Sequence, residues 1–145
     1  MAFVAHTGTV TVHTRGRGFY DITEQVTRHL PLAAVGAGTC TVCVMHTSAS
    51  LIIFENADPT AKADIDAWMR RHVPDGDPAY SHSDEGPDDM PSHIRAALTA
   101  TTLTIPVSEG SLMLGRWQAI YLWEHRTAPH ARAVAVACVG TDGRS

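Results

Sequence analysis

Residues 39–54 read TCTVCVMHTSASLIIF and predict two neighbouring strands, 39–45 and 51–54, joined by a short polar connection. In the first strand polar and apolar side chains alternate, so residues three apart point to opposite faces of the sheet. Cys40 and Cys43 are three apart. They are therefore poorly placed to act together as a zinc or redox pair, and we expect buried thiols that fill the core.

Other strands are predicted on both sides of this stretch. Period-two alternation marks 9–14 before it. After it, β-like runs lie at 102–107, at 111–114 continuing at 117–124, and at 132–139.

Helices are indicated at three places between the strands. Asp21 and Glu24 predict the start of a short helix, while Asp58 as N-cap and Pro59 at the first helical position predict a second. Pro91, also placed at a first helical position, predicts a third after a long acidic loop. Strands mixed with two or three helices, without regular alternation, predict an α+β fold: a single domain over 1–145 on mostly antiparallel sheet.

The composition narrows the functional classes. The chain has 145 residues, of which 44% are apolar and 18% charged, as in a compact globular protein. Its formal charge of -4 and the lack of a basic cluster argue against a nucleic-acid partner. No uncharged apolar stretch reaches the roughly 18 residues of a membrane helix, and the N-terminus has no signal-peptide pattern. We therefore expect a cytoplasmic protein with no membrane partner.

The nine histidines are the first candidates for chemistry. His46 follows a predicted central strand, where a rigid backbone can aim it into a cleft. His93 lies in the first turn of a predicted helix, whose dipole favours the neutral imidazole that a metal requires. His82 belongs to the acidic loop, whose carboxylates can supply ligands or orient imidazoles. The long, irregular spacing of these histidines is a weak metal signal in itself.

Two further stretches carry polar side chains in unusual places. In 55–58, ENAD, a carboxylate can act as a base, although Asp58 also has the role of a helix cap. In 117–126, WQAIYLWEHR, Gln118 and Glu124 share a strand face with apolar residues and need partners if they are buried. Ser48 lacks a nucleophile-elbow pattern, which argues against Ser-His-Asp hydrolysis.

Five motifs in the same order resemble the YjbQ-like family, also called the secondary thiamine-phosphate synthase family. They are HTSASL at 46–51, ENADP at 55–59, YSH at 80–82, EGPDDMPSHI at 85–94 and GRWQAIYLWEHR at 115–126. The resemblance covers essentially the whole chain. It implies a small α+β fold that assembles as a homotrimer and a cleft with a divalent metal ion, zinc or magnesium.

The resemblance also implies roles for individual residues. The expected metal ligands are His46, His82 and His93. The expected catalytic residues are Glu55, Asp89, Gln118, Glu124 and His125. The expected substrate-binding residues are Ser48, Asn56, Arg116, Trp117 and Arg126.

The leading hypothesis is a metal-assisted enzyme with thiamine-phosphate synthase-like activity on a small phosphorylated substrate. Stabilising a departing diphosphate normally takes a metal and cationic side chains. Arg116 and Arg126 are the only cationic side chains in the five motifs. This predicts that the synthase activity is secondary. The alternatives are a metal-dependent hydrolase and a non-enzymatic binding module for a small phosphorylated metabolite.

Overall fold

The computed structural model describes residues 1–144, which form two antiparallel sheets, three α-helices and one 3-10 turn. The larger sheet has the strand order β1 (Phe3–Thr14), β8 (His130–Thr141), β3 (Ala37–Val44), β5 (Thr102–Ser108) and β6 (Ser111–Leu112). The smaller sheet has the order β2 (Gly18–Asp21), β7 (Gln118–Glu124) and β4 (Ala49–Glu55). The predicted α+β class on antiparallel sheet is confirmed.

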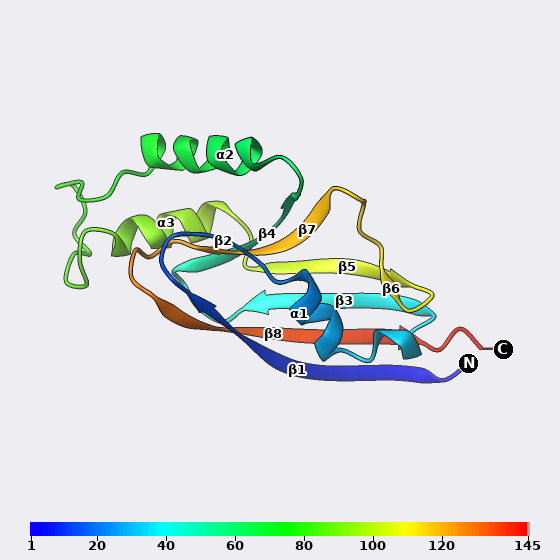
Figure 1. Ribbon diagram of the computed structural model, residues 1–145. Coiled ribbons are helices and arrows are strands. Elements are labelled where there is room, and N and C mark those ends of the chain that lie inside the picture. The colour runs from blue at the N-terminus through cyan, green and yellow to red at the C-terminus, as the bar shows by residue number, and fades with distance from the viewer. Residues whose placement is uncertain (145) are drawn as a thin grey trace.

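Three helices cover the sheets. α1 (Thr23–His29) leads into the 3-10 turn Leu32–Ala34, while α2 (Pro59–His72) and α3 (Asp89–Leu98) lie together at one end of the molecule (Figure 1). Asp58 caps α2 by accepting the N–H of Thr60 at 2.9 Å, and Pro59 occupies its first turn as predicted. No helix within residues 1–144 is long and apolar enough to cross a membrane.

The buried side chains form two clusters. The main core joins the two sheets and α1 through residues such as Val42, Leu122 and Val136, none of them more than 2% exposed. Cys40 belongs to this core, as predicted, and Cys43 is half-buried. A second cluster around Trp123 joins the smaller sheet to α2 and α3. These contacts fix the two helices against the strands that carry the polar motifs.

The connection between β3 and β4 turns a corner of the fold. The two strands are consecutive in the sequence but belong to different sheets, so the chain crosses from one sheet to the other at 45–48. The Met45 N–H donates to Ala133 in the larger sheet, and the Ser48 carbonyl accepts from the His125 N–H next to the smaller one. His46 and Thr47 therefore lie on a tethered corner.

The start of α3 differs from the prediction. Pro91 is the third residue of the helix, which begins at Asp89. The first-turn N–H groups of a helix have no intrahelical partner, so proline fits at the third position as well as at the first. The earlier start places Asp89 and His93 one turn apart on the same helix face.

Candidate metal centre

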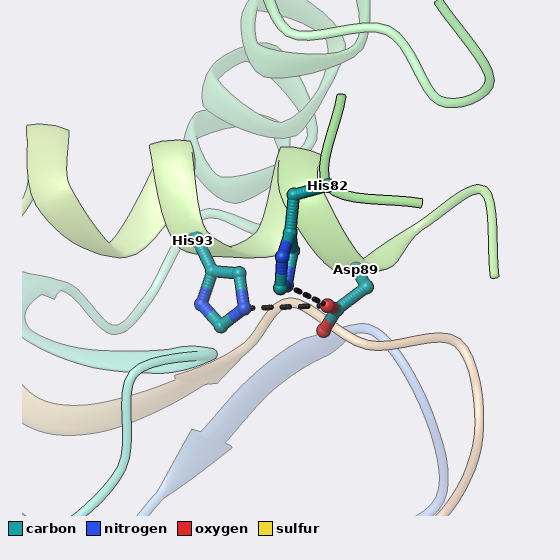
Figure 2. A group of neighbouring side chains, drawn as sticks. All are labelled: His82, Asp89 and His93. Atoms are coloured by element: carbon teal, nitrogen blue, oxygen red, sulfur yellow. Dashed lines mark ion pairs between the residues drawn. The ribbon is translucent and has the colours of Figure 1, made fainter. Parts of the chain in front are cut away.

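Three side chains meet at one point beside the N-terminal turn of α3. His82 Nε2 lies 2.8 Å from Asp89 Oδ2, and His93 Nε2 lies 3.3 Å from the same oxygen. One ligand atom from each residue falls within 4.8 Å of the others. Figure 2 shows both rings turned towards the carboxylate, with Asp89 and His93 on the helix and His82 on the preceding loop.

The protonation of His93 is fixed by its other nitrogen. Nδ1 lies 3.0 Å from the Thr47 carbonyl oxygen, which can only accept a hydrogen bond. Nδ1 therefore carries the proton, and in the neutral ring Nε2 presents a lone pair towards Asp89. Imidazoles that bind metals commonly donate their second N–H to a backbone carbonyl in this way.

Asp89 Oδ2 is the atom that lacks a partner. The Asp89 side chain is 1% exposed, and Oδ2 is buried with no aligned hydrogen bond from the described residues. Burying a carboxylate oxygen without a donor or a cation is costly. A proton on one of the two imidazoles or a metal ion between them would satisfy this oxygen, and a metal ion would also use the lone pair of His93.

The second oxygen of Asp89 is held from behind by an arginine. Arg126 Nη1 donates to Asp89 Oδ1 at 2.9 Å, and Arg126 Nε donates to Asp88 Oδ2 at 3.0 Å. Burial raises the pKa of Asp88, but hydrogen bonds from the Thr127 N–H and from Arg126 outweigh it and lower that pKa to about 2. Arg126 is therefore a support for the cluster, with its guanidinium already bound to carboxylates.

A groove of about 630 Å³ opens beside the cluster. It contains His46 as well as His82 and His93, and its other walls are Thr47, Met90, Ala96, Ala97 and Thr101. The three histidines predicted as ligands thus reach one groove. His46 is not in the group of converging ligand atoms, where Asp89 takes the third position.

His46 rests on a buried polar chain. Its Nδ1 accepts from the Ser48 N–H at 3.1 Å and lies 2.9 Å from Ser48 Oγ, which in turn accepts from Arg132 Nη2 at 2.9 Å. Desolvation, followed by the charge of Arg132, lowers the pKa of His46 below its ordinary 6.5, which keeps the ring neutral near pH 7. Arg132 is paired with both oxygens of Glu124. Ser48 and Glu124, predicted as binding and catalytic residues, therefore lie beneath the groove.

His125 is placed in the interior instead of the groove. Its ring is fully buried, with Nε2 at 2.8 Å from Ser50 Oγ. Burial, followed by the nearby cations Arg95, Arg17 and Arg132, lowers the pKa of His125 to about 3. Among the described residues His125 is not one that lines the groove, and its predicted catalytic role stays a prediction.

Five predicted site residues lie at the other end of the smaller sheet. Ala49 of β4 pairs with Glu124, and Glu55 pairs with Gln118 six residues further along. At about 3.3 Å per residue the two ends are roughly 20 Å apart. Their roles in the same site stay predictions that one chain does not bring together. The residues at this far end are Glu55, Asn56, Arg116, Trp117 and Gln118.

Most of the far-end polar groups have structural contacts. Glu55 Oε2 accepts the N–H groups of Ala57 and Asp58 at 2.7 Å each, which orders the turn before α2. Gln118 Oε1 accepts the Gly115 N–H at 2.7 Å, and Gln118 is exposed, so Glu124 is the buried member of this polar pair on β7.

The neighbouring residues have similar contacts. Asn56 Nδ2 donates to the carbonyls of Arg116 and Gln118 at 3.4 Å each. The Arg116 guanidinium lies 4.9 Å from the centre of the exposed Trp117 ring.

Comparison with known proteins gives the family. A sequence profile described as "UPF0047 protein YjbQ-like" matches residues 8–141. The chain belongs to this family. A UPF0047 protein of Synechocystis is 44% identical over 138 residues, covering 95% of this chain and 94% of that protein. A UPF0047 protein YjbQ of Salmonella typhimurium is 42% identical over 133 residues, covering 91% and 96%.

Solved structures agree on the fold. A protein of the YjbQ/UPF0047 family from Clostridium acetobutylicum, described as uncharacterized, has a TM-score of 0.78 at 35% identity and covers 88% of this chain and 96% of that one. A YbjQ-like protein of unknown function from Sulfolobus solfataricus has a TM-score of 0.84 at 23% identity, covering 96% and 99%. The second match shows the shared fold alone.

Proposed function

We propose that this protein is a metal-assisted enzyme whose ion is held by His82, Asp89 and His93. The observation that carries the proposal is the buried Asp89 Oδ2, which faces a bare imidazole nitrogen and accepts no aligned hydrogen bond. Arg126 would hold the carboxylate and the Thr47 carbonyl would hold the His93 ring, so both ligands are oriented by the fold.

The donor set favours zinc over magnesium. Two imidazole nitrogens and one carboxylate suit zinc and similar transition metals, whereas Mg²⁺ takes mainly oxygen ligands. Three protein ligands beside a groove leave a further position for a ligand atom, as in catalytic zinc sites. When bound, such an ion would polarise a phosphate or activate water.

Two reactions are consistent with this groove. The family resemblance implies thiamine-phosphate synthase-like transfer to or from a small phosphorylated substrate. No Lys or Arg is among the described residues that line the groove, and Arg126 is bound to Asp88 and Asp89. Because no cationic side chain among these lining residues would stabilise a departing diphosphate, a synthase activity would be secondary. Metal-dependent hydrolysis is the second candidate.

The expected assembly and location belong to the same proposal. We propose a homotrimer in the cytoplasm. The support for the trimer is the family resemblance of the sequence motifs. Sedimentation velocity on the untagged protein tests the trimer, and a monomer would contradict it.

Metal analysis tests the proposed centre. Untagged protein is loaded with Zn²⁺, passed through a desalting column and analysed by mass spectrometry for metal content. We expect about one ion per chain, and we expect Asp89→Asn and His93→Gln to lose it because each removes a ligand. His13→Gln, at an exposed histidine on β1, is the matched control and keeps the ion.

Activity is then measured with the loaded protein. Formation of thiamine phosphate from a pyrimidine diphosphate and a thiazole phosphate is followed beside phosphate release from small phosphate esters. Turnover that disappears in Asp89→Asn but not in His13→Gln supports the enzyme. Wild-type protein that retains no ion, or that shows equal turnover with and without it, would contradict the metal-assisted mechanism.

A further inference from the structure

His46 lies in the same groove as the proposed metal centre but has a different hydrogen-bonding state. Its Nδ1 is approached by the Ser48 backbone N–H at 3.1 Å. A backbone N–H can only donate, so Nδ1 must be an acceptor and cannot carry a proton. The neutral His46 ring therefore has its proton on Nε2. That is the opposite tautomer to His93, whose Nδ1 carries the proton.

The Ser48 hydroxyl reinforces this assignment. Arg132 Nη2 donates to Ser48 Oγ at 2.9 Å, which occupies a lone pair of the oxygen. The hydroxyl proton is then free to point at His46 Nδ1, 2.9 Å away. Every hydrogen bond from Arg132 to His46 thus runs in one direction, and the direction is set by a guanidinium that cannot accept.

The residues at the start of this series of hydrogen bonds are buried. Arg132 is 2% exposed and Ser48 is 1% exposed, while Glu124 is completely buried and pairs with Arg132 Nε at 2.8 Å. Thr14 Oγ1 donates to Glu124 Oε1 at 2.7 Å and so satisfies the carboxylate further. Buried ion pairs contribute little net stability because both charges lose their water. Stability alone therefore does not explain why this series of hydrogen bonds ends at His46 in the groove.

We propose that His46 is a fixed hydrogen-bond donor of the groove, whose Nε2–H binds an oxygen of an oxyanion ligand held at the His82–Asp89–His93 centre. Ser48, Arg132 and Glu124 are positioning residues that act through His46. The inference rests on the proposed function for the identity of the site. It replaces the expected metal-ligand role of His46 with ligand recognition, because the nitrogen that faces away from Ser48 carries a proton.

The groove walls indicate the rest of the ligand. Met90, Ala96 and Ala97 form apolar walls beside the histidines. A small molecule with a phosphate or carboxylate group and an apolar body fits both parts: the oxyanion between the cation and His46, and the body against α3. Phenyl phosphate has both features and serves as the probe.

Nitrogen NMR tests the tautomer directly. Protein labelled with ¹⁵N-histidine is recorded at pH 7.5 with and without Zn²⁺, and His46 is assigned by its loss in His46→Gln. We expect an unprotonated Nδ1 and a protonated Nε2 for His46 in both samples, and a protonated Nδ1 for His93. A protonated Nδ1 in His46, or Nε2 signals that shift as a metal ligand's would on zinc addition, overturns the proposal.

Calorimetric titration with phenyl phosphate tests the recognition. With zinc-loaded protein we expect His46→Leu to raise the dissociation constant for phenyl phosphate by about tenfold or more. This is the loss of affinity typical of one hydrogen bond to a charged group. His46→Gln recovers part of the affinity through its amide N–H. Ser48→Ala weakens binding less than His46→Leu, and Ser50→Ala, a buried serine outside this chain of bonds, leaves it unchanged.

The outcomes separate this inference from the proposed function. Unchanged phenyl phosphate affinity in His46→Leu, with the ion retained, overturns the donor role and leaves the metal centre standing. Loss of the ion in His46→Leu overturns it too, since His46 would then be a ligand. If the wild type binds no ion, the proposed function fails, and the tautomer measured in metal-free protein still decides the state of His46.

Discussion

The buried pair of Glu124 and Arg132 allows a sharp stability prediction. Glu124→Gln keeps the size of the side chain but removes its charge, so the buried Arg132 guanidinium loses the carboxylate that compensates it. Removing one partner of a buried pair costs about 3–5 kcal/mol. A domain of this size is stabilised by about 5–15 kcal/mol in total. The substitution is therefore expected to remove a large share of the free energy of unfolding.

The same magnitude can be expressed as a melting shift. An unfolding entropy of about 2.1 cal/mol/K per residue gives about 0.3 kcal/mol/K for this chain, so the midpoint should fall by roughly 10–16 °C. The assays are urea titration followed by circular dichroism and a thermal scan. Glu85→Gln is the matched control: Glu85 also faces an arginine, Arg126, but at 3.8 Å and with 69% of its side chain exposed. We expect less than about 1 kcal/mol for this control.

A double variant separates compensation from packing. Replacing both charges, in Glu124→Leu with Arg132→Met, removes the uncompensated cation, so the double variant should be more stable than Glu124→Gln. The reasoning would be refuted by a loss below about 1 kcal/mol in Glu124→Gln, or by a double variant that is no more stable than the single one.

Three further outcomes follow from the shifted pKa values and from burial. The pKa of Asp88 is about 2 in the fold against an ordinary 3.8, so Asp88→Asn should cost about 2 kcal/mol at pH 7, a deficit that closes as the pH falls from 4 to 2 in urea titrations. The pKa of His125 is about 3 in the fold against an ordinary 6.5, so as the pH falls this histidine is protonated in the unfolded chain before it is protonated in the folded one. Wild-type stability should fall by about 3 kcal/mol between pH 6.5 and 4, and His125→Gln should flatten that slope. Burial, with the neighbouring Cys138, raises the pKa of Cys40 to about 11, so only Cys43 should react with a thiol reagent in the native state, and all three after denaturation.

Most of the secondary structure could be predicted from the sequence because its signals are local. Alternation indicated β1 and β3, β-like runs indicated β5 and β8, and the Asp58–Pro59 pair indicated the start of α2. Alternation says which face a side chain occupies and not which sheet its strand joins, so the separation of β3 and β4 into two sheets could not be read from it.

The candidate metal centre could be predicted from the sequence only in part. His82 and His93 were expected in one metal centre and do converge, and Asp89 was expected close to them. The role of Asp89 as a third ligand depends on the start of α3, because Asp89 and His93 share a helix face only if the helix includes both. An aspartate and a histidine four residues apart beside a helix-start proline were the available signal. The state of His46 depends on the Ser48 N–H, and the sequence does not show where that group points.

The motif at 115–126 also shows why neighbours in a sequence need not share a task. Its middle part forms the extended strand β7, Gln118–Glu124, so the two ends of the motif are separated by at least the length of the strand. At one end Glu124 and Arg126 support His46 and Asp89, the two sides of the groove. At the other end Gln118 orders the turn at Gly115. A motif on a helix could present several of these side chains to one ligand, but a strand divides them between two places, and the proposed metal centre lies at the end beside α3.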